Sequence, residues 1–212
     1  MKLFKCILLV LALLYLTSAG AQPEAGKDYM LLDQPQPARS GNKIEVIEFF
    51  FYGCEHCFKL RPLLNTWLHD HANEVEFVMV PTFFAARFEP MARTFYALQA
   101  LGQQQELEEP LFNAWNVDKL KLQDEASATD FLAQHGVDRN KFAAAYNSPA
   151  VQDKVLQAKR MEKLYGVTNT PSLIVNGKYR VSANVKSFTW RKPEEIMHIF
   201  QAVVDKARGD LL

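Results

Sequence analysis

Hydrophobic residues along the chain change their spacing twice between the two termini. In the first and last thirds, short continuous apolar runs are separated by longer helix-like segments, and such runs are typical of strands buried on both faces of a sheet. Between residues 82 and 147 the strand signals disappear, and helix start and stop signals take their place. The pattern therefore predicts an α/β protein that carries a helical block between its two halves.

The first half contains one strand–helix–strand unit. Residues 44–52 and 75–80 form apolar runs that predict two buried strands, and residues 56–71 predict the helix between them. A connection of this kind favours parallel pairing of the two strands. The segment before them is rich in Pro, Gly and polar residues, and only residues 29–32 are a strand candidate there.

The helical block is punctuated by turn residues and is rich in aromatic residues. Pro90 is placed to open its first helix, and Gly102 and Gly136 are placed to end helices. We expect helices at about residues 90–99, 110–115, 126–135 and 138–146. We expect the aromatic residues to form the core of the block, namely Phe83, Phe84, Phe95, Tyr96, Phe112 and Trp115.

The second half predicts a long helix, a hairpin and a closing helix. Ser148 and Pro149 are preferred residues for the N-cap and the first position of a helix. Asn176 and Gly177 join two short strand candidates as a two-residue hairpin turn. An amphipathic helix over residues 193–207 completes the chain.

The first 21 residues have the features of an export signal. Two lysines precede an apolar run over residues 7–16, which is too short to span a bilayer, and residues 19–21 offer a small-x-small cleavage site. We therefore expect cleavage after Ala21, with an uncleaved membrane anchor as the alternative. Removal of 21 of the 212 residues leaves a mature chain of 191 residues.

Charge and cysteine content limit the function further. The chain has 24 basic and 24 acidic residues, and no basic patch stands out, so we do not expect a nucleic acid partner. Cys6 belongs to the export signal, so only Cys54 and Cys57 remain after cleavage. A mature chain of this length can build a core without disulfide staples. We expect a soluble exported protein in an oxidising compartment.

The two remaining cysteines stand at the junction of a predicted strand and a predicted helix. In Cys54-Glu55-His56-Cys57 the sulfurs have a spacing at which a disulfide can close. Backbone N–H groups and the dipole at a helix N-terminus stabilise a thiolate, which makes the corresponding disulfide an oxidant. A passive structural disulfide and half of a zinc site are the alternatives. A structural disulfide that closes so short a loop would stabilise the fold little. A zinc site needs two more ligands, which the sequence does not offer, so we expect no metal.

These features together resemble the DsbA family of bacterial periplasmic thiol:disulfide oxidases. The resemblance rests on the export signal, the cysteine motif, Glu48 six residues ahead of it, and Gly166-Val167-Thr168-Asn169-Thr170-Pro171 before a strand and an Asn-Gly-Lys-Tyr hairpin. It covers about residues 28–207 and implies a thioredoxin fold with an inserted all-helical domain. The implied domains are residues 22–81 with 148–212 for the thioredoxin-like domain, and residues 82–147 for the helical insertion.

Within the motif, Cys54 is expected to be the more exposed, nucleophilic sulfur and Cys57 the buried, resolving sulfur. His56 can place a donor or a positive charge near the Cys54 thiolate, and the resemblance favours this role over that of a solvated histidine. Glu55 departs from the family, in which many members have proline at this position. Its carboxylate should disfavour the thiolate slightly, which would weaken the protein as an oxidant.

Two residues of a second loop extend the predicted site. Proteins with a thioredoxin fold carry a cis proline in the loop that faces the cysteines, and the resemblance assigns this place to Pro171. Such a bond leaves the preceding backbone free to pair with a substrate strand, and the Thr170 hydroxyl would help to release mixed-disulfide partners. An ordinary trans proline is the alternative for Pro171, and a plain strand residue is the alternative for Thr170.

Glu48 lies in an apolar strand, where a charged side chain is costly without a partner. By resemblance it is a buried acid near Cys57 that relays a proton during thiol exchange. The alternative is an edge position that faces water. The nearby Lys43, Lys59 and Arg61 are too ordinary in this pattern to be assigned a role.

The resulting interpretation is a monomeric disulfide oxidase that acts on unfolded exported proteins. Cys54 forms a mixed disulfide with the substrate, whose second thiolate then resolves it and leaves the enzyme reduced. The resemblance implies reoxidation by a membrane quinone reductase of the DsbB type, and it implies no metal or organic cofactor. A reductase or isomerase on the same fold and a peptide-binding chaperone with incidental thiols are the alternatives.

Overall fold

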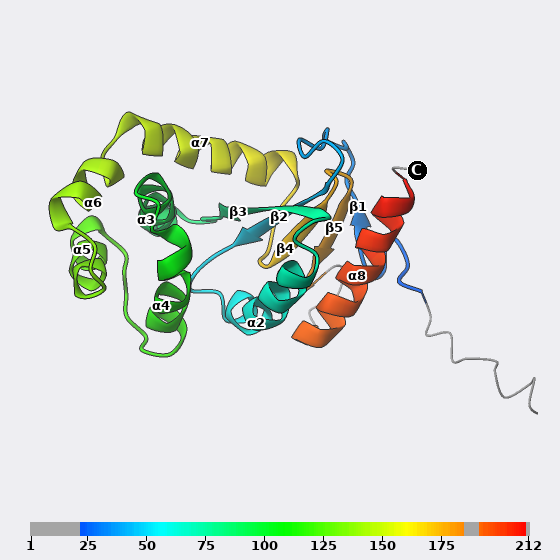
Figure 1. Cartoon of the computed structure of the whole chain (residues 1–212), viewed down its shortest axis with the longest axis horizontal. Coiled ribbons are helices and arrows are strands. Elements are labelled where there is room, and N and C mark those ends of the chain that lie inside the picture. Colours follow the sequence, from blue (N-terminus) through cyan, green and yellow to red (C-terminus); the bar gives the residue numbers. More distant parts are fainter. Residues whose placement is uncertain (1–21, 185–190, 211–212) are drawn as a thin grey trace, which may run out of the picture.

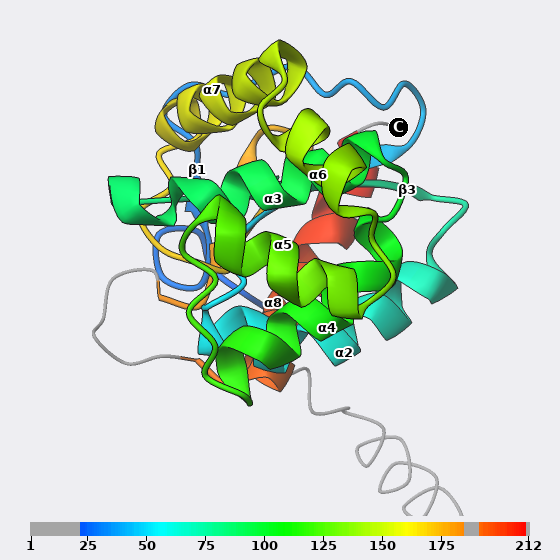
Figure 2. The same ribbon diagram turned by 90° about the vertical axis from the view of Figure 1, so that its left-hand side faces the viewer.

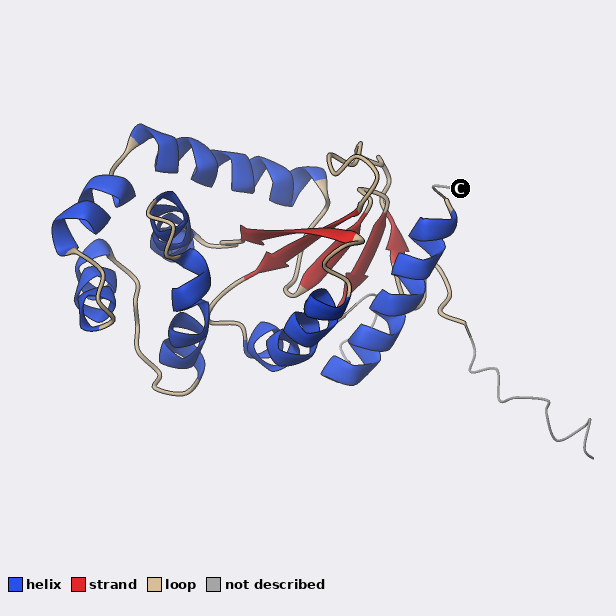
Figure 3. Cartoon of the chain, in the orientation of Figure 1, coloured by secondary structure: helices blue, strands red, loops and turns tan. Residues whose placement is uncertain are grey.

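The computed structural model describes residues 22–184 and 191–210, so the predicted export signal over residues 1–21 lies outside the described residues. The described residues form a five-stranded sheet with the order β1-β5-β4-β2-β3 (Figures 1 and 3). Its strands are β1 (Met30–Leu31), β2 (Ile44–Phe50), β3 (Val75–Pro81), β4 (Ser172–Val175) and β5 (Tyr179–Ser182). β2 pairs with β3 in parallel, as predicted, and the other pairs are antiparallel.

Three of the described helices cover the two faces of the sheet. α2 (Glu55–Asp70) and α8 (Pro193–Gly209) lie on one face, and α7 (Pro149–Leu164) lies on the other (Figure 1). Successive side chains of β2 point to opposite faces of the sheet, so they contribute to two separate core regions. Val46 packs on the side of α2 and α8, whereas Ile47 and Phe49 pack on the side of α7. Since β2 lies between two other strands, every residue of β2 is buried.

The segment between β3 and α7 forms the helical insertion. It contains the short 3-10 helix η1 (Ala86–Phe88), α3 (Glu89–Ala100), α4 (Gln104–Asn116), α5 (Glu125–Gln134) and α6 (Arg139–Tyr146). Figures 1 and 2 show α3 to α6 gathered at one end of the sheet. α4 begins well before the predicted residue 110, because its polar first turns bury only Leu107 and so give little periodic signal. Among the described helices, none is long and apolar enough to cross a membrane.

The aromatic core of the insertion differs from the prediction at one residue. Phe84 is 50% exposed, although it was expected in the core. It follows the buried Phe83 in the loop after β3, and the chain bends at Phe84, so only one of the two side chains enters the core. The other predicted residues are buried or half-buried: Phe83, Phe95, Tyr96, Phe112 and Trp115.

Local sequence rules account for the start of α7 and for the β4–β5 turn. The Ser148 hydroxyl accepts a hydrogen bond from the Val151 backbone N–H at 3.2 Å, and Pro149 occupies the first helical position. Asn176 and Gly177 have φ angles of 47° and 60°. These positive values fit a turn that favours Asn-Gly, but Val175 pairs with Tyr179, so the loop also includes Lys178 and has three residues and not the predicted two.

Gly177→Ala should destabilise the fold more than Gly136→Ala. Both glycines have a positive φ, 60° and 85°, so alanine costs about 1 kcal/mol at either position. A Cβ at Gly177 would lie 2.1 Å from the Gln36 carbonyl oxygen, whereas a Cβ at Gly136 would meet nothing within 4 Å. We therefore expect a further loss of about 1–3 kcal/mol for Gly177→Ala in the free energy of unfolding, measured by urea titration. Equal losses in the free energy of unfolding for the two variants would contradict the close approach of the Gln36 carbonyl to Gly177.

Candidate active site

The two cysteines lie at the start of α2, directly after β2. Cys54 is the N-cap residue, and its sulfur accepts a hydrogen bond from the Cys57 backbone N–H at 3.3 Å. Both cysteines are free thiols in this structure. Cys54 is partly exposed and Cys57 is fully buried, as expected from the sequence.

Gly53 makes room for the turn that carries Cys54. A Cβ at this position would lie 2.7 Å from the Phe51 ring and 2.9 Å from the Trp115 ring. These two rings pack together with centroids 5.6 Å apart, and they come from the loop after β2 and from α4. The role of Gly53 carries no signal in the sequence, since a lone glycine after a strand gives no sign of what lies next to it.

Several hydrogen bonds stabilise the thiolate of Cys54, whose pKa is lowered to about 7. The largest cause is a hydrogen bond from the Cys57 side chain, and burial of the sulfur acts in the opposite direction. The Thr170 side chain and the backbone N–H groups of Cys57 and His56 lower the pKa further. Burial raises the pKa of Cys57 well above its usual value, so thiolate formation is confined to Cys54.

The loop before β4 brings Thr170 and Pro171 to the cysteines. The Thr170–Pro171 peptide bond is cis, as predicted. The Cys54 thiol donates a hydrogen bond to the Thr170 carbonyl oxygen, with a sulfur–oxygen distance of 3.4 Å. Thr170 is buried, and its hydroxyl is the group whose hydrogen bond favours the thiolate. The loop therefore contacts the reactive sulfur through both the backbone and a side chain.

The two residues between the cysteines contribute less charge than the sequence suggested. Burial lowers the pKa of His56 below its ordinary value, which favours the neutral imidazole. Of the two roles predicted for His56, a hydrogen-bond donor is favoured over a positive charge, and both stay predictions. The exposed Glu55 carboxylate forms an ion pair with Lys59, one turn along α2, at 2.5 Å. This pairing partly offsets the charge that was expected to disfavour the thiolate.

Glu48 is fully buried in the middle of β2, which rules out the alternative of a water-facing edge position. Its carboxylate forms an ion pair with the buried Arg61 of α2. The Arg61 Nε lies 3.1 Å from a carboxylate oxygen of Glu108 on α4. Burial raises the pKa of Glu48, although Arg61 acts in the opposite direction. The charge of Glu48 also raises the pKa of Cys57, so these two groups are electrostatically coupled.

Neither Arg61 nor Glu108 was predicted to belong to the site, and only one of them carries a usable signal in the sequence. Arg61 lies four residues after Cys57, so the two share one face of α2. A position one turn from a buried cysteine is expected to face the same core, and a buried charge requires a partner. Glu108 is one of several glutamates at the start of α4, and nothing in the local pattern distinguishes it.

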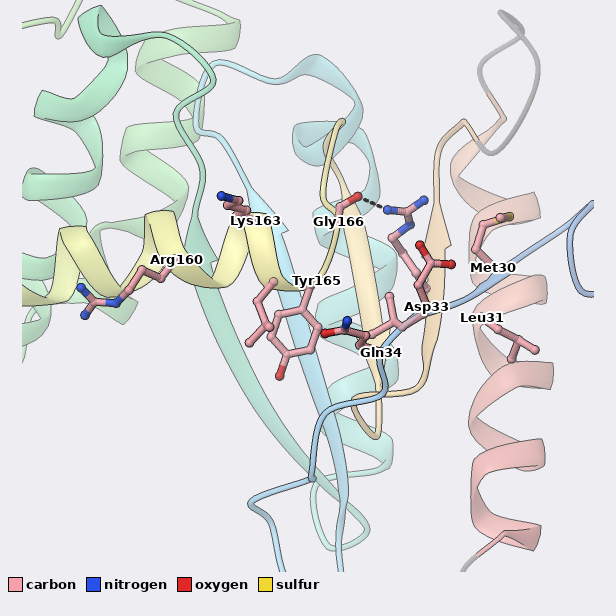
Figure 4. Close-up of a pocket in the computed structure, with 11 residues that line it drawn as sticks. Met30, Leu31, Asp33, Gln34, Arg160, Lys163, Tyr165 and Gly166 are labelled. Atoms are coloured by element: carbon pink, nitrogen blue, oxygen red, sulfur yellow. Dashed lines mark hydrogen bonds between the residues drawn. The ribbon is translucent and has the colours of Figure 1, made fainter.

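A separate cavity of about 590 Å³ lies between the end of α7, the segment after β1 and Arg180 of β5 (Figure 4). The Arg180 side chain donates a hydrogen bond to the Gly166 carbonyl, just past the end of α7. The residues that line this cavity include neither Cys54 nor Cys57, so the cavity is not the redox site. Within the described ranges, no three His, Cys, Asp or Glu side chains come together as metal ligands would.

A thiol pair at the N-terminus of a helix, next to an interior strand of the sheet and facing a cis-proline loop, defines a thiol:disulfide oxidoreductase with a thioredoxin fold. The model of the DSBA-like thioredoxin domain matches residues 74–192. The thiol:disulfide interchange protein DsbA of Burkholderia cepacia is 38% identical over 182 residues, which cover 84% of this chain and 86% of the relative.

Structural similarity agrees with the sequence comparison. The DsbA of Pseudomonas aeruginosa is 33% identical over 203 residues and 94% of both chains. Its crystal structure superposes with a TM-score of 0.80 and covers 88% of this chain and 95% of the other. The chain belongs to the DsbA family, and its activity is thiol:disulfide interchange.

Cys57→Ala should raise the pKa of Cys54, because it removes the largest hydrogen bond to the thiolate. We expect the midpoint of the thiolate absorbance band to rise from about 7 in the wild type, by about one pH unit. Cys57→Ser is the matched control, since it retains a hydroxyl donor, and its midpoint should stay near that of the wild type. A midpoint in Cys57→Ala equal to that of the wild type would contradict the assignment of Cys57 as the main hydrogen-bond donor to the thiolate.

Reduction should stabilise the protein increasingly as the pH rises from 6 to 8. The pKa of Cys54, about 7, lies below its ordinary value. A depressed folded pKa gives stability that is complete above the unfolded pKa and is lost as the pH falls through the folded pKa. The reduced form should gain about 1 kcal/mol relative to the disulfide form, or about 2–4 °C in Tm. Paired thermal melts measure this, and a constant Tm difference would argue against the depressed pKa.

Proposed function

We propose that this protein oxidises pairs of thiols in unfolded exported proteins, with Cys54 as the sulfur that substrates attack. The observation that carries this proposal is the environment of Cys54, a partly exposed N-cap sulfur that accepts a hydrogen bond from the backbone at 3.3 Å. Such a sulfur is accessible to an incoming thiolate and is a good leaving group. The fully buried Cys57 is shielded from direct attack.

The exchange requires two successive displacements at sulfur. A substrate thiolate attacks Cys54, the bond between Cys54 and Cys57 breaks, and Cys57 leaves with the electron pair. A second substrate thiolate then attacks the substrate sulfur of the mixed disulfide, and Cys54 leaves as a thiolate. The substrate gains a disulfide and loses two electrons, and the protein keeps them as two reduced cysteines.

The remaining predicted residues are proposed to assist these steps. Glu48 protonates the buried Cys57 sulfur as it leaves, which its burial and raised pKa support. The backbone before Pro171 pairs with an extended substrate segment, and the Thr170 hydroxyl, already directed to the sulfur, helps release. His56 acts as a neutral donor beside Cys54.

The cellular setting follows from membership of the family and from the sequence. We propose a periplasmic monomer whose signal is cleaved after Ala21 and whose cysteine pair is reoxidised by a membrane quinone reductase of the DsbB type. The reaction needs only the cysteine pair, without a metal or organic cofactor. We also propose the division into residues 22–81 with 148–212 and residues 82–147 as that of two structural domains.

One observation favours reduction or isomerisation as a second candidate. The pKa of Cys54, about 7, is depressed only moderately, and a stronger oxidant stabilises its thiolate more. The chaperone alternative predicts that peptide binding survives when both cysteines are replaced by serine. Loss of all disulfide transfer in that double variant, with unchanged folding, would support the redox function.

Cys57→Ser should accumulate covalent complexes with substrate proteins, because no internal thiol remains to attack the mixed disulfide at Cys54. Cys54→Ser should accumulate none, since Cys57 has no exposed surface. Each variant is first treated with oxidised glutathione, so that an accessible cysteine carries a mixed disulfide that a substrate thiolate can displace. Non-reducing gels after incubation with a reduced, unfolded substrate then measure the complexes. Equal accumulation in both variants would contradict the roles assigned to the two sulfurs.

A further inference from the structure

The ion cluster next to Cys57 is larger than a single buried acid requires. Glu48 on β2 has no exposed surface, and Arg61 on α2 is 7% exposed. Arg61 pairs with Glu48 on one side, and its Nε lies 3.1 Å from Oε1 of Glu108 on the other. Glu108 belongs to α4 in the helical insertion. One guanidinium is therefore shared by two carboxylates that come from different parts of the fold.

The two carboxylates lie in different surroundings. Oε2 of Glu48 contacts Arg61, whereas its Oε1 is buried and has no hydrogen-bond partner. The Glu108 side chain is 14% exposed, and Gln104 donates a hydrogen bond to its Oε2 at 3.3 Å. Glu108 and Arg61 both line a cavity of about 750 Å³ between α2, β3 and α4. Glu48 is thus the inner acid, with one oxygen available for a proton, and Glu108 is the outer acid.

We propose that Glu108 is a positioning residue for the proton step at Cys57, and that it acts by preventing Arg61 from pairing completely with Glu48. When a substrate thiolate breaks the Cys54–Cys57 bond, Cys57 leaves as a thiolate. A proton then moves from Oε1 of Glu48 to the Cys57 sulfur, and the Glu48 carboxylate that results is held by Arg61. The reverse reaction returns the proton to Glu48. This inference rests on the proton role proposed above for Glu48.

The sharing of Arg61 determines whether Glu48 can carry a proton at neutral pH. A carboxylate that has a guanidinium to itself stays ionised and has no proton to give. Burial raises the pKa of Glu48, Arg61 lowers it, and the charge of Glu108 raises it again. Arg61 remains charged throughout, because a guanidinium is not deprotonated in proteins. It therefore controls Glu48 by its charge and does not relay the proton.

The other titratable groups near this cluster do not replace Glu108. Cys57 on α2 is the partner in the proton transfer, and burial raises the pKa of Tyr52, which stays neutral. Glu48 pairs in the sheet with Met79 on β3 and Leu173 on β4, neither of which carries a charge. The cavity wall also includes three exposed groups that are not among the partners of Arg61 in the described structure: His69, Glu106 and Glu109.

The pH dependence of disulfide opening tests this proposal. Oxidised protein is mixed with reduced glutathione, and the rate is divided by the concentration of glutathione thiolate at each pH. The corrected wild-type rate should fall as Glu48 loses its proton. In Glu108→Gln this fall should occur about one pH unit lower, which makes the variant about threefold slower midway between the two midpoints and about tenfold slower above both.

Glu109→Gln is the matched control, because it removes the same charge from the next residue of α4 on the wall of the same cavity. Its profile should coincide with that of the wild type, and Glu108→Asp, which keeps the charge, should do so as well. An unshifted profile in Glu108→Gln, or the same shift in Glu109→Gln, would overturn the proposal. If Glu108→Gln does not fold, Glu108→Ser removes the same charge and must give the same shift.

Glu48→Gln separates this proposal from the role of Glu48 itself. If Glu48→Gln keeps the wild-type profile, Glu48 is not the proton donor, and both ideas fail. If Glu48→Gln abolishes the pH-dependent fall and Glu108→Gln leaves it in place, only the role of Glu108 fails. A lower Tm for Glu108→Gln without a shifted profile would indicate a purely structural role and would count against the proposal.

Discussion

The sulfur of Cys54 serves as the N-cap of α2, and most of the site is arranged around this one hydrogen bond. A capping atom must lie close to the backbone N–H groups of the first helical turn, and the Cys57 N–H reaches the sulfur at 3.3 Å. The chain can hold that position because β2 ends there and is fixed on both sides by neighbouring strands. The loop before β4 then places the Thr170 carbonyl 3.4 Å from the same sulfur.

Burial separates two chemically identical thiols into different roles. Cys54 has a lowered pKa because donors surround its thiolate, whereas burial raises the pKa of Cys57. A similar contrast in burial exists in the ion cluster next to Cys57, where the buried Glu48 and the partly exposed Glu108 share Arg61. Pairs of groups whose environments push their pKa values apart are suited to divide proton transfer between them. The helical insertion thus contributes a charge to the site, although the cysteines belong to the sheet half of the fold.

The sequence was sufficient for features that depend on neighbouring residues. The Ser148-Pro149 helix start, the Asn176-Gly177 turn and the parallel pairing of β2 with β3 follow from local rules and from the length of the connection. Features that depend on tertiary contacts were missed. The burial of Arg61, its pairing with Glu108 and the exposure of Phe84 depend on how α4 and the loop after β3 pack.

The equilibrium between the Cys54–Cys57 pair and glutathione tests the central claim most directly. If the protein is the oxidase proposed above, the couple should be more oxidising than about −200 mV, so that glutathione reduces the protein readily. The reduced fraction of the protein is measured by fluorescence or by mass spectrometry in buffers with defined ratios of reduced to oxidised glutathione. A potential of about −270 mV or lower would place the couple among reductants and would contradict the oxidase function.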